Sequence, residues 1–138
     1  DGVPGGAEVV SPSPARRDEV RAYVEARTHL TVPLTVLSPT LVPQTITLSS
    51  LTPNTPAVQA AVAAELASLF ARDAAVPIPT AGPVADAGEP EGDILISRIR
   101  EAISAAAGEE DHVLSSPAAN VAIPNAGELL TFGSLVTP

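Results

Sequence analysis

The sequence lacks cysteine, methionine, tryptophan and lysine, and its 138 residues include one tyrosine and two phenylalanines. The absence of cysteine excludes disulfides, thiolate zinc sites and a cysteine nucleophile. Aromatic rings supply the largest single burials in most protein cores. A core built here from alanine, valine, leucine and isoleucine must consist of many small contacts, so we expect modest stability for the isolated chain.

Basic charge is also scarce, because seven arginines stand against 16 acidic residues, for a net charge of −9 and a pI near 4.4. Nucleic acids and anionic membranes are bound through dense positive charge, so we expect neither partner. No apolar run approaches the ~18 residues of a membrane span, and we expect no signal segment. The opening Asp1-Gly2-Val3-Pro4 is typical of a piece of a longer protein or of a processed product.

The N-terminal part predicts an extended lead-in over residues 1–12 and then a surface helix. Ser13-Pro14 is a typical helix start, with serine as the N-cap and proline at the first helical position. Val20, Tyr23 and Val24 repeat at helical spacing and predict one narrow buried stripe. The arginines of this helix are interpreted as a solvated face.

Residues 30–50 change to a period of two, which is typical of strands. A hairpin centred on Pro39 would place the apolar residues of both arms on one face. It would make the pairs Val36–Val42, Val32–Ile46 and Leu30–Leu48. A looser bend between two strands that pair elsewhere is the alternative. Pro33 and Pro43 cannot donate to a ladder and restrict these strands to edges or to non-hydrogen-bonded positions.

A second helix is predicted to begin at Thr55-Pro56 and to end near Asp73. Its apolar stripe consists of Val58, Val62, Leu66, Leu69 and Phe70, on a background of alanine with high helix propensity. Residues 74–92 hold prolines, glycines and acids without periodicity, and they predict a linker or a long loop.

The C-terminal part predicts a strand at 93–96, a third helix capped by Ser97, and three further strands. Gly108 supplies the left-handed stop of that helix. The strands are expected at 112–115, 120–123 and 129–136, separated by turns at Ser116-Pro117 and at 124–127. The apolar positions of the helix are Ile99, Ala102, Ile103 and Ala106.

This order of elements predicts an α+β fold with three helices and mostly antiparallel strands and hairpins. The chain divides into the lead-in at 1–12, a helix–hairpin–helix module at 13–73, the loop or linker at 74–92 and a strand–helix–three-strand module at 93–138. The length of the loop is unusual inside a compact domain, so it marks either a boundary between two small subdomains or a projecting insertion.

Catalytic chemistry has few candidates in this sequence. His112 follows Glu109-Glu110-Asp111 and precedes Ser115-Ser116, but neighbours on a strand point to opposite faces, so Asp111 and His112 would not meet. His29 is expected to lie at the surface. The acids of 86–93 lie in a loop that cannot hold paired carboxylates rigidly. We therefore predict no catalytic, cofactor-binding or metal-binding residues and no enzyme activity.

Three segments of the sequence resemble the C-terminal end of the baseplate J-like proteins, which are structural proteins of contractile phage tails and related injection particles. The similar segments are Val32–Pro39 with Thr45–Leu48, Ile96–Ile103, and the spacing from Gly108 and Ser116-Pro117 to Gly127–Gly133. The resemblance runs in order from about Pro14 to the end of the chain. Family members are longer, the 74–92 stretch is longer than the expected short turn, and Asn120 stands where an aspartate is common.

The resemblance implies a wedge component of the baseplate, located in the virion tail or in a cytoplasmically assembled injection particle. It implies other baseplate and wedge proteins and further copies of the chain as partners, with no nucleic acid, membrane or small-molecule substrate. The alternative is a non-catalytic binding or adhesion module of a secreted or surface protein. Edge strands and a sparse aliphatic core suit either structural role, because a partner's surface can complete them.

Overall fold

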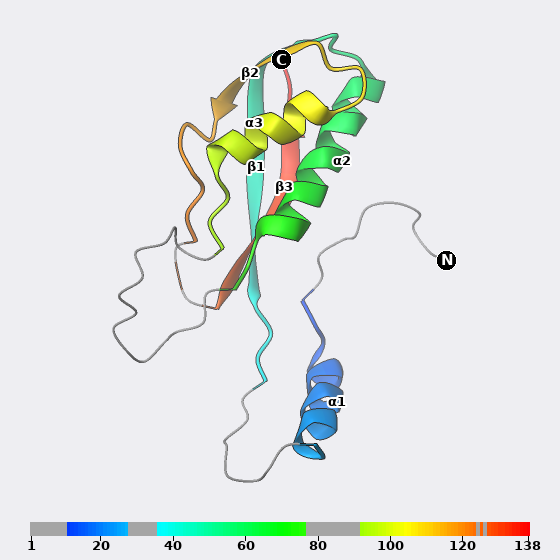
Figure 1. The fold of residues 1–138 in the computed structure, drawn as a ribbon, viewed down its shortest axis with the longest axis vertical. Coiled ribbons are helices and arrows are strands. Elements are labelled where there is room, and N and C mark those ends of the chain that lie inside the picture. Colours follow the sequence, from blue (N-terminus) through cyan, green and yellow to red (C-terminus); the bar gives the residue numbers. More distant parts are fainter. Residues whose placement is uncertain (1–10, 28–35, 77–91, 124, 126) are drawn as a thin grey trace.

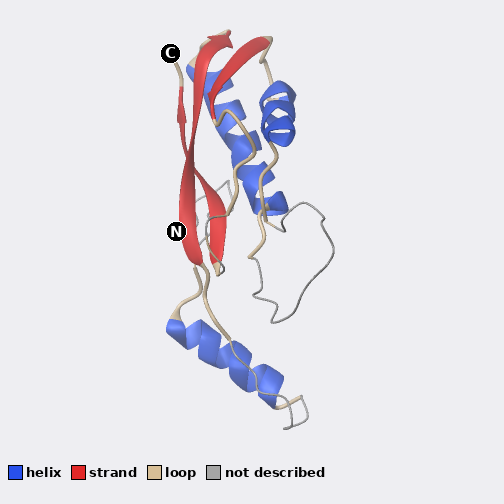
Figure 2. Cartoon of the chain, turned by 90° about the vertical axis from the view of Figure 1, so that its left-hand side faces the viewer, coloured by secondary structure: helices blue, strands red, loops and turns tan. Residues whose placement is uncertain are grey.

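The computed structural model describes residues 11–27, 36–76, 92–123, 125 and 127–138. Within these ranges the chain forms three helices and one three-stranded sheet, which confirms the α+β class. The sheet, α2 (Pro56–Asp73) and α3 (Ile96–Ala105) make one body, and α1 (Pro14–Glu25) lies apart from it in both views (Figures 1 and 2). None of the described helices is long and apolar enough to cross a membrane.

The middle strand of the sheet is β1 (Thr40–Thr52). β2 (Asp111–Ser116) pairs with its second half in the antiparallel sense, and β3 (Glu128–Val136) pairs with its first half in the parallel sense. The strands expected at 112–115 and 129–136 are thereby confirmed.

The hairpin centred on Pro39 is wrong where the structure describes it. Val36 lies in no strand, and Val42 pairs with Leu130 of β3. The pairs predicted for Leu30 and Val32 fall outside the described residues. Alternation shows which side chains share a face, but it does not show which strand lies alongside. β1 therefore pairs elsewhere, as the looser alternative allowed.

The expectation of mostly antiparallel pairing is wrong for β1 and β3, whose ladder is parallel and the longer of the two. Parallel neighbours need a long crossover connection, and here α2, α3 and β2 all lie between β1 and β3 in the chain. Gly133 sits at the irregular step of this ladder, where an added Cβ would lie 3.0 Å from the Gln44 carbonyl oxygen. The close approach of the two backbones explains this glycine.

The short strands expected at 93–96 and 120–123 are wrong, because only one bridge forms, between Ile94 and Val121. Two backbone hydrogen bonds of 2.8 and 2.9 Å join these residues. The first of these segments cannot extend as a strand, because α3 begins at Ile96.

α2 agrees with the sequence prediction in its bounds and in its buried face. Thr55 Oγ1 accepts a hydrogen bond from the Val58 backbone N–H at 3.4 Å, and Pro56 occupies the first helical position. The helix ends at Asp73, as expected. Its buried residues are the five of the predicted stripe, Val58, Val62, Leu66, Leu69 and Phe70.

α3 begins two residues earlier than predicted, and Ser97 is not its cap. Leu95 takes the cap position without a side-chain hydrogen bond. The Ile96 backbone N–H instead donates to Asn120 Oδ1 at 3.0 Å. A cap supplied from 24 residues away leaves no local signal in the sequence. The predicted apolar face is confirmed, and Gly108 has the expected left-handed backbone, with φ of 85°.

The core lies between the sheet and the two helices, and its members come from residues 46–70 and 94–130. α2 packs against α3 and β3, and α3 packs against β2 (Figure 2). Phe70 of α2 and Phe132 of β3 meet with ring centroids 6.3 Å apart. The other members of this core are aliphatic, as the composition predicted: Ile46, Leu48, Leu51, Val58, Val62, Leu66, Leu69, Ile94, Ile99, Ala102, Ile103, Ala106 and Leu130.

α1 begins as predicted, with Ser13 Oγ accepting from the Arg16 backbone N–H at 3.3 Å and Pro14 at the first position. Its expected buried stripe is wrong, because no residue of α1 is buried. Val20 is 42% exposed and Tyr23 is 61% exposed. α1 packs against none of the other described helices or strands. Most of the loop predicted at 74–92 lies outside the described residues.

Replacing Leu66 with aspartate is expected to abolish the cooperative thermal unfolding of the chain. Leu66 is fully buried in the α2 stripe, and an unpaired carboxylate there costs several kcal/mol, comparable to the whole stability of a small domain, about 5–15 kcal/mol. Circular dichroism during heating measures the transition. Ser68→Asp, at an exposed position of the same helix, is the matched control and should melt close to the natural chain. Equal melting of the two variants would contradict the assigned helix face.

Asn120→Ala is expected to lower the free energy of unfolding by about 1 kcal/mol, because the first turn of α3 loses its only side-chain cap. In a domain of this size that loss corresponds to a fall of about 4–8 °C in the melting temperature. Asn120→Asp should keep the stability, since a carboxylate also accepts from the helix N-terminus and interacts favourably with its dipole. An alanine variant as stable as the aspartate variant would show that the long-range cap contributes nothing.

Candidate interaction surface

The residues considered for catalysis do not come together in the structure. Asp111 is exposed, whereas the neighbouring His112 is half-buried, as the alternation along a strand predicts. The Ser115 hydroxyl donates to the Thr47 carbonyl oxygen at 3.2 Å, on the exposed side of β2. His29 lies outside the described residues. No triad of serine, histidine and aspartate is present in the described part of the chain.

His112 instead pairs with Glu109, at the junction between α3 and β2. Its Nδ1 lies 2.7 Å from Glu109 Oε1, and the two side chains are 11% and 5% exposed. Neither side chain of this pair is solvated, although the residues between them are acidic and exposed. Tertiary packing shields the carboxylate, and the imidazole supplies the hydrogen bond that a buried polar group needs. Glu110 and Asp111 beside them are exposed.

The other predicted carboxylate candidates have a structural partner or lie outside the described ranges. Asp93 Oδ1 accepts a hydrogen bond from the Ile123 backbone N–H at 3.1 Å, which ties the start of α3 to the 121–123 segment. The acids at 86–91 are outside the described residues. Among those described, no group of three or more histidine, aspartate and glutamate side chains is placed to hold a metal ion.

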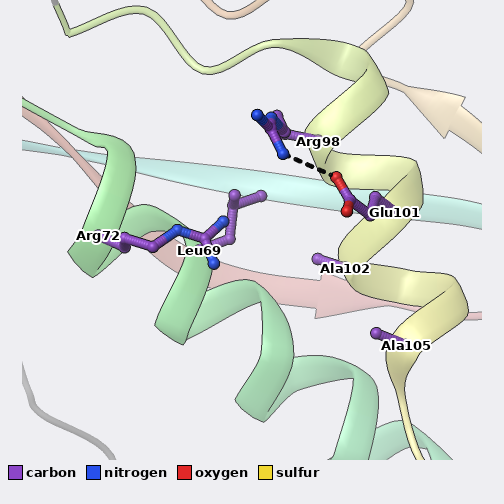
Figure 3. A pocket seen from close by; sticks show the side chains of 6 residues that line it. All are labelled: Leu69, Arg72, Arg98, Glu101, Ala102 and Ala105. Carbon is purple, nitrogen blue, oxygen red and sulfur yellow. Dashed lines mark hydrogen bonds and ion pairs between the residues drawn. The ribbon is translucent and has the colours of Figure 1, made fainter.

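A small hollow of about 140 Å³ lies where α2 meets α3 (Figure 3). Two arginines stand at its rim, and each has a carboxylate partner. Arg72 Nε donates to Asp73 at 2.6 Å, and this hydrogen bond, together with the Asp73 charge, raises the pKa of the Arg72 guanidinium. Arg98 donates to Glu101 at 3.1 Å. Each guanidinium is thus already paired with a carboxylate of its own helix. We therefore interpret the hollow as a gap in the packing of α2 against α3 and not as an anion-binding site.

The sheet offers a larger candidate surface. Both α2 and α3 lie on one face of the sheet, and no described helix covers the other, which we call the open face (Figure 2). Val113 and Val136, which are 50% and 46% exposed, are on it. The ladder registers place mostly small uncharged residues there, with Asp111 at one corner: Leu41, Pro43, Thr45, Thr47, Ser50, Val113, Leu129, Ser134 and Val136. Thr131 has the same register but is buried. A solvated sheet face is usually polar, so this composition favours contact with another protein.

α1 is the second candidate surface. Two hydrogen bonds join the chain segments that lead into and away from the helix, from Ser11 Oγ to the Pro39 carbonyl at 3.0 Å and from Ser38 Oγ to the Pro12 carbonyl at 2.8 Å. Arg27 stacks on the exposed Tyr23 ring, with its guanidinium carbon 3.7 Å from the ring centroid. Sequence reasoning found the apolar stripe of this helix but placed it in the core, because periodicity alone does not say what covers a face.

The Glu109–His112 pair is expected to stabilise the junction between α3 and β2. Replacing His112 with alanine leaves a shielded carboxylate without its partner, which costs about 1–3 kcal/mol. Chemical denaturation of the natural chain, the two single alanine variants and the double variant gives the coupling energy directly. A double variant less unstable than the sum of the single variants is expected. Strict additivity would show that the two groups do not interact.

Comparison with known proteins places this chain among baseplate proteins. Residues 44–137 match the family described as the Baseplate J-like protein C-terminal domain, a range that holds most of β1, α2, α3, β2 and β3. The match begins later than the resemblance drawn from about Pro14, so α1 precedes it. No solved structure matches the chain significantly.

Among curated proteins, the chain is similar to JayE of Escherichia coli (strain K12), with 39% identity over 84 residues. The aligned part is 61% of this chain and 26% of JayE, so the chain corresponds to about a quarter of the length of that relative. The family match covers α2, α3, β2, β3 and most of β1, and well over half of the chain. The chain therefore belongs to the baseplate J-like protein family, through its C-terminal domain.

Proposed function

We propose that the protein is a structural subunit of the baseplate wedge in a contractile phage tail or a related injection particle. Membership in the baseplate J-like family is the observation that carries this proposal. The proposed partners are other baseplate and wedge proteins and further copies of this chain. Its proposed location is the tail baseplate of the virion, or the baseplate of an injection particle assembled in the cytoplasm. The proposal assigns the chain no catalytic role and no cofactor.

The surfaces of the fold support a role in assembly. The open face combines exposed Val113 and Val136 with small hydroxyl side chains, and such a face can pack closely against a neighbour without desolvating charged groups. β2 and β3 are the outer strands of the sheet. Outer strands carry backbone groups with which a neighbouring chain can pair. These features explain how a module with so few bulky side chains can serve as a building block.

Each of the substitutions Val113→Arg and Val136→Arg is expected to block incorporation of the chain into the particle. The chain itself should remain folded. Both valines are about half exposed, so the isolated chain tolerates the change, whereas an interface would have to bury an unpaired charge. Particles purified from producing cells are separated by density and probed for this chain, and circular dichroism checks folding. We expect at least a tenfold loss of incorporated protein.

Ala64→Arg, at an exposed position of α2, is the matched control and should be incorporated normally. Normal incorporation of both valine variants would exclude the open face as an assembly contact. Absence of the natural chain from every purified particle would overturn the wedge proposal itself.

A further inference from the structure

α1 and the turn that follows it are richer in positive charge than the rest of the described chain. Residues 11–27 hold four arginines against three acids, for a net charge of +1, whereas residues 36–76 sum to −1 and residues 92–138 to −4. In an acidic protein, four of the seven arginines are thus gathered in one short helix and the turn that follows it. Within α1 itself three arginines balance three acids, and the excess positive charge comes from Arg27 in the turn.

The arginines of α1 border its apolar stripe. At 3.6 residues per turn, Arg16 and Arg27 fall on the Tyr23 side of Val20, and Arg17 and Arg21 fall on the Val24 side. Asp18 and Glu25 lie on the opposite side of the helix. Contacts in the structure agree, since Arg27 stacks on Tyr23, and a hollow of about 390 Å³ lies against Arg16, Glu19, Val20 and Tyr23. One edge of the apolar face of α1 therefore carries Arg17 and Arg21, whereas on the Tyr23 side Arg16 is ion-paired with Glu19.

The β2 corner of the open face has the complementary pattern. Val113 is 50% exposed there, and the exposed acids Glu110 and Asp111 lie beside it at the start of β2. A helix of 12 residues is about 18 Å long and a strand of six residues about 20 Å. The two surfaces therefore agree in length and in apolar character, and Arg17 and Arg21 of α1 are opposite in charge to the two acids.

These two surfaces do not meet within one chain. α1 packs against none of the other described helices or strands, and both ribbon views show it away from the body (Figures 1 and 2). We propose that α1 of one copy docks on the β2 corner of the open face of a second copy, with Arg17 and Arg21 against Glu110 and Asp111. The inference rests on the proposed role as an assembly subunit and names the partner of that role. Because the contact joins two different patches, it forms either a reciprocal dimer or an open chain of copies.

Sedimentation velocity of the purified full chain over a range of concentrations tests the proposal. We expect reversible association that weakens at high ionic strength, because the arginine–carboxylate attractions are screened. Val20→Ser combined with Tyr23→Ser should raise the dissociation constant at least tenfold. The melting temperature of the body should stay unchanged, since α1 packs against none of its helices or strands. Asp18→Asn with Glu25→Gln, on the opposite side of α1, is the control and should not weaken association.

A charge exchange makes the test specific. One variant carries Arg17→Glu and Arg21→Glu, and a second variant carries Glu110→Arg and Asp111→Arg. Each alone sets like charges against each other and should remain monomeric. A mixture of the two restores both contacts and should associate about as tightly as the natural chain. A natural chain that stays monomeric at all concentrations, or variants that associate without any change, would overturn the inference. If the open-face variants still fail to enter particles in that case, the wedge proposal stands and only the α1 contact falls.

Discussion

Burial of the apolar stripe of α2 beneath a sheet built around β1 is the interaction on which this fold depends. Val62 and Leu66 of the helix and Ile46 of the strand are fully shielded from solvent, and the one aromatic pair of this core, Phe70 with Phe132, connects the helix to β3. Because the sequence has so few aromatic side chains, no single large residue can supply the apolar burial that this helix–sheet contact provides. α3 and β3 pack directly against α2, and β2 packs against α3.

α2 and α3 cover one face of the sheet, and no described helix covers the open face. Two helices are enough to bury the inward side chains of β1 and β3, and α1 is the remaining helix of the described chain but lies elsewhere. The residues of the open face are short and nearly free of charge, although the protein as a whole carries a net charge of −9. A monomer that must stay soluble would place charge there. The distribution of charge over the molecule thus agrees with the role in assembly that we propose for this chain.

The polar side chains that could take part in catalysis or metal binding instead stabilise the fold. Glu109 and His112 satisfy each other behind the start of β2, Asp93 holds the 121–123 segment, and Asn120 caps α3. Each of these contacts fixes a connection that lacks regular secondary structure. Because buried carboxylates and imidazoles need partners, these groups give definition to a core whose aliphatic packing is by itself weakly directional.

The sequence by itself determined the elements whose signals are local. Capping chemistry predicts the helix starts at Ser13-Pro14 and Thr55-Pro56. Periodicity predicts the buried face of α2 and the strands around residues 112 and 132. The family follows from residue order. Only the tertiary structure decided that β1 pairs with β3 in parallel, that Asn120 caps a helix 24 residues away, and that Val20 and Tyr23 of α1 stay exposed. A periodic pattern states which side chains share a face, whereas the partner of that face is fixed by long-range packing that no local pattern encodes.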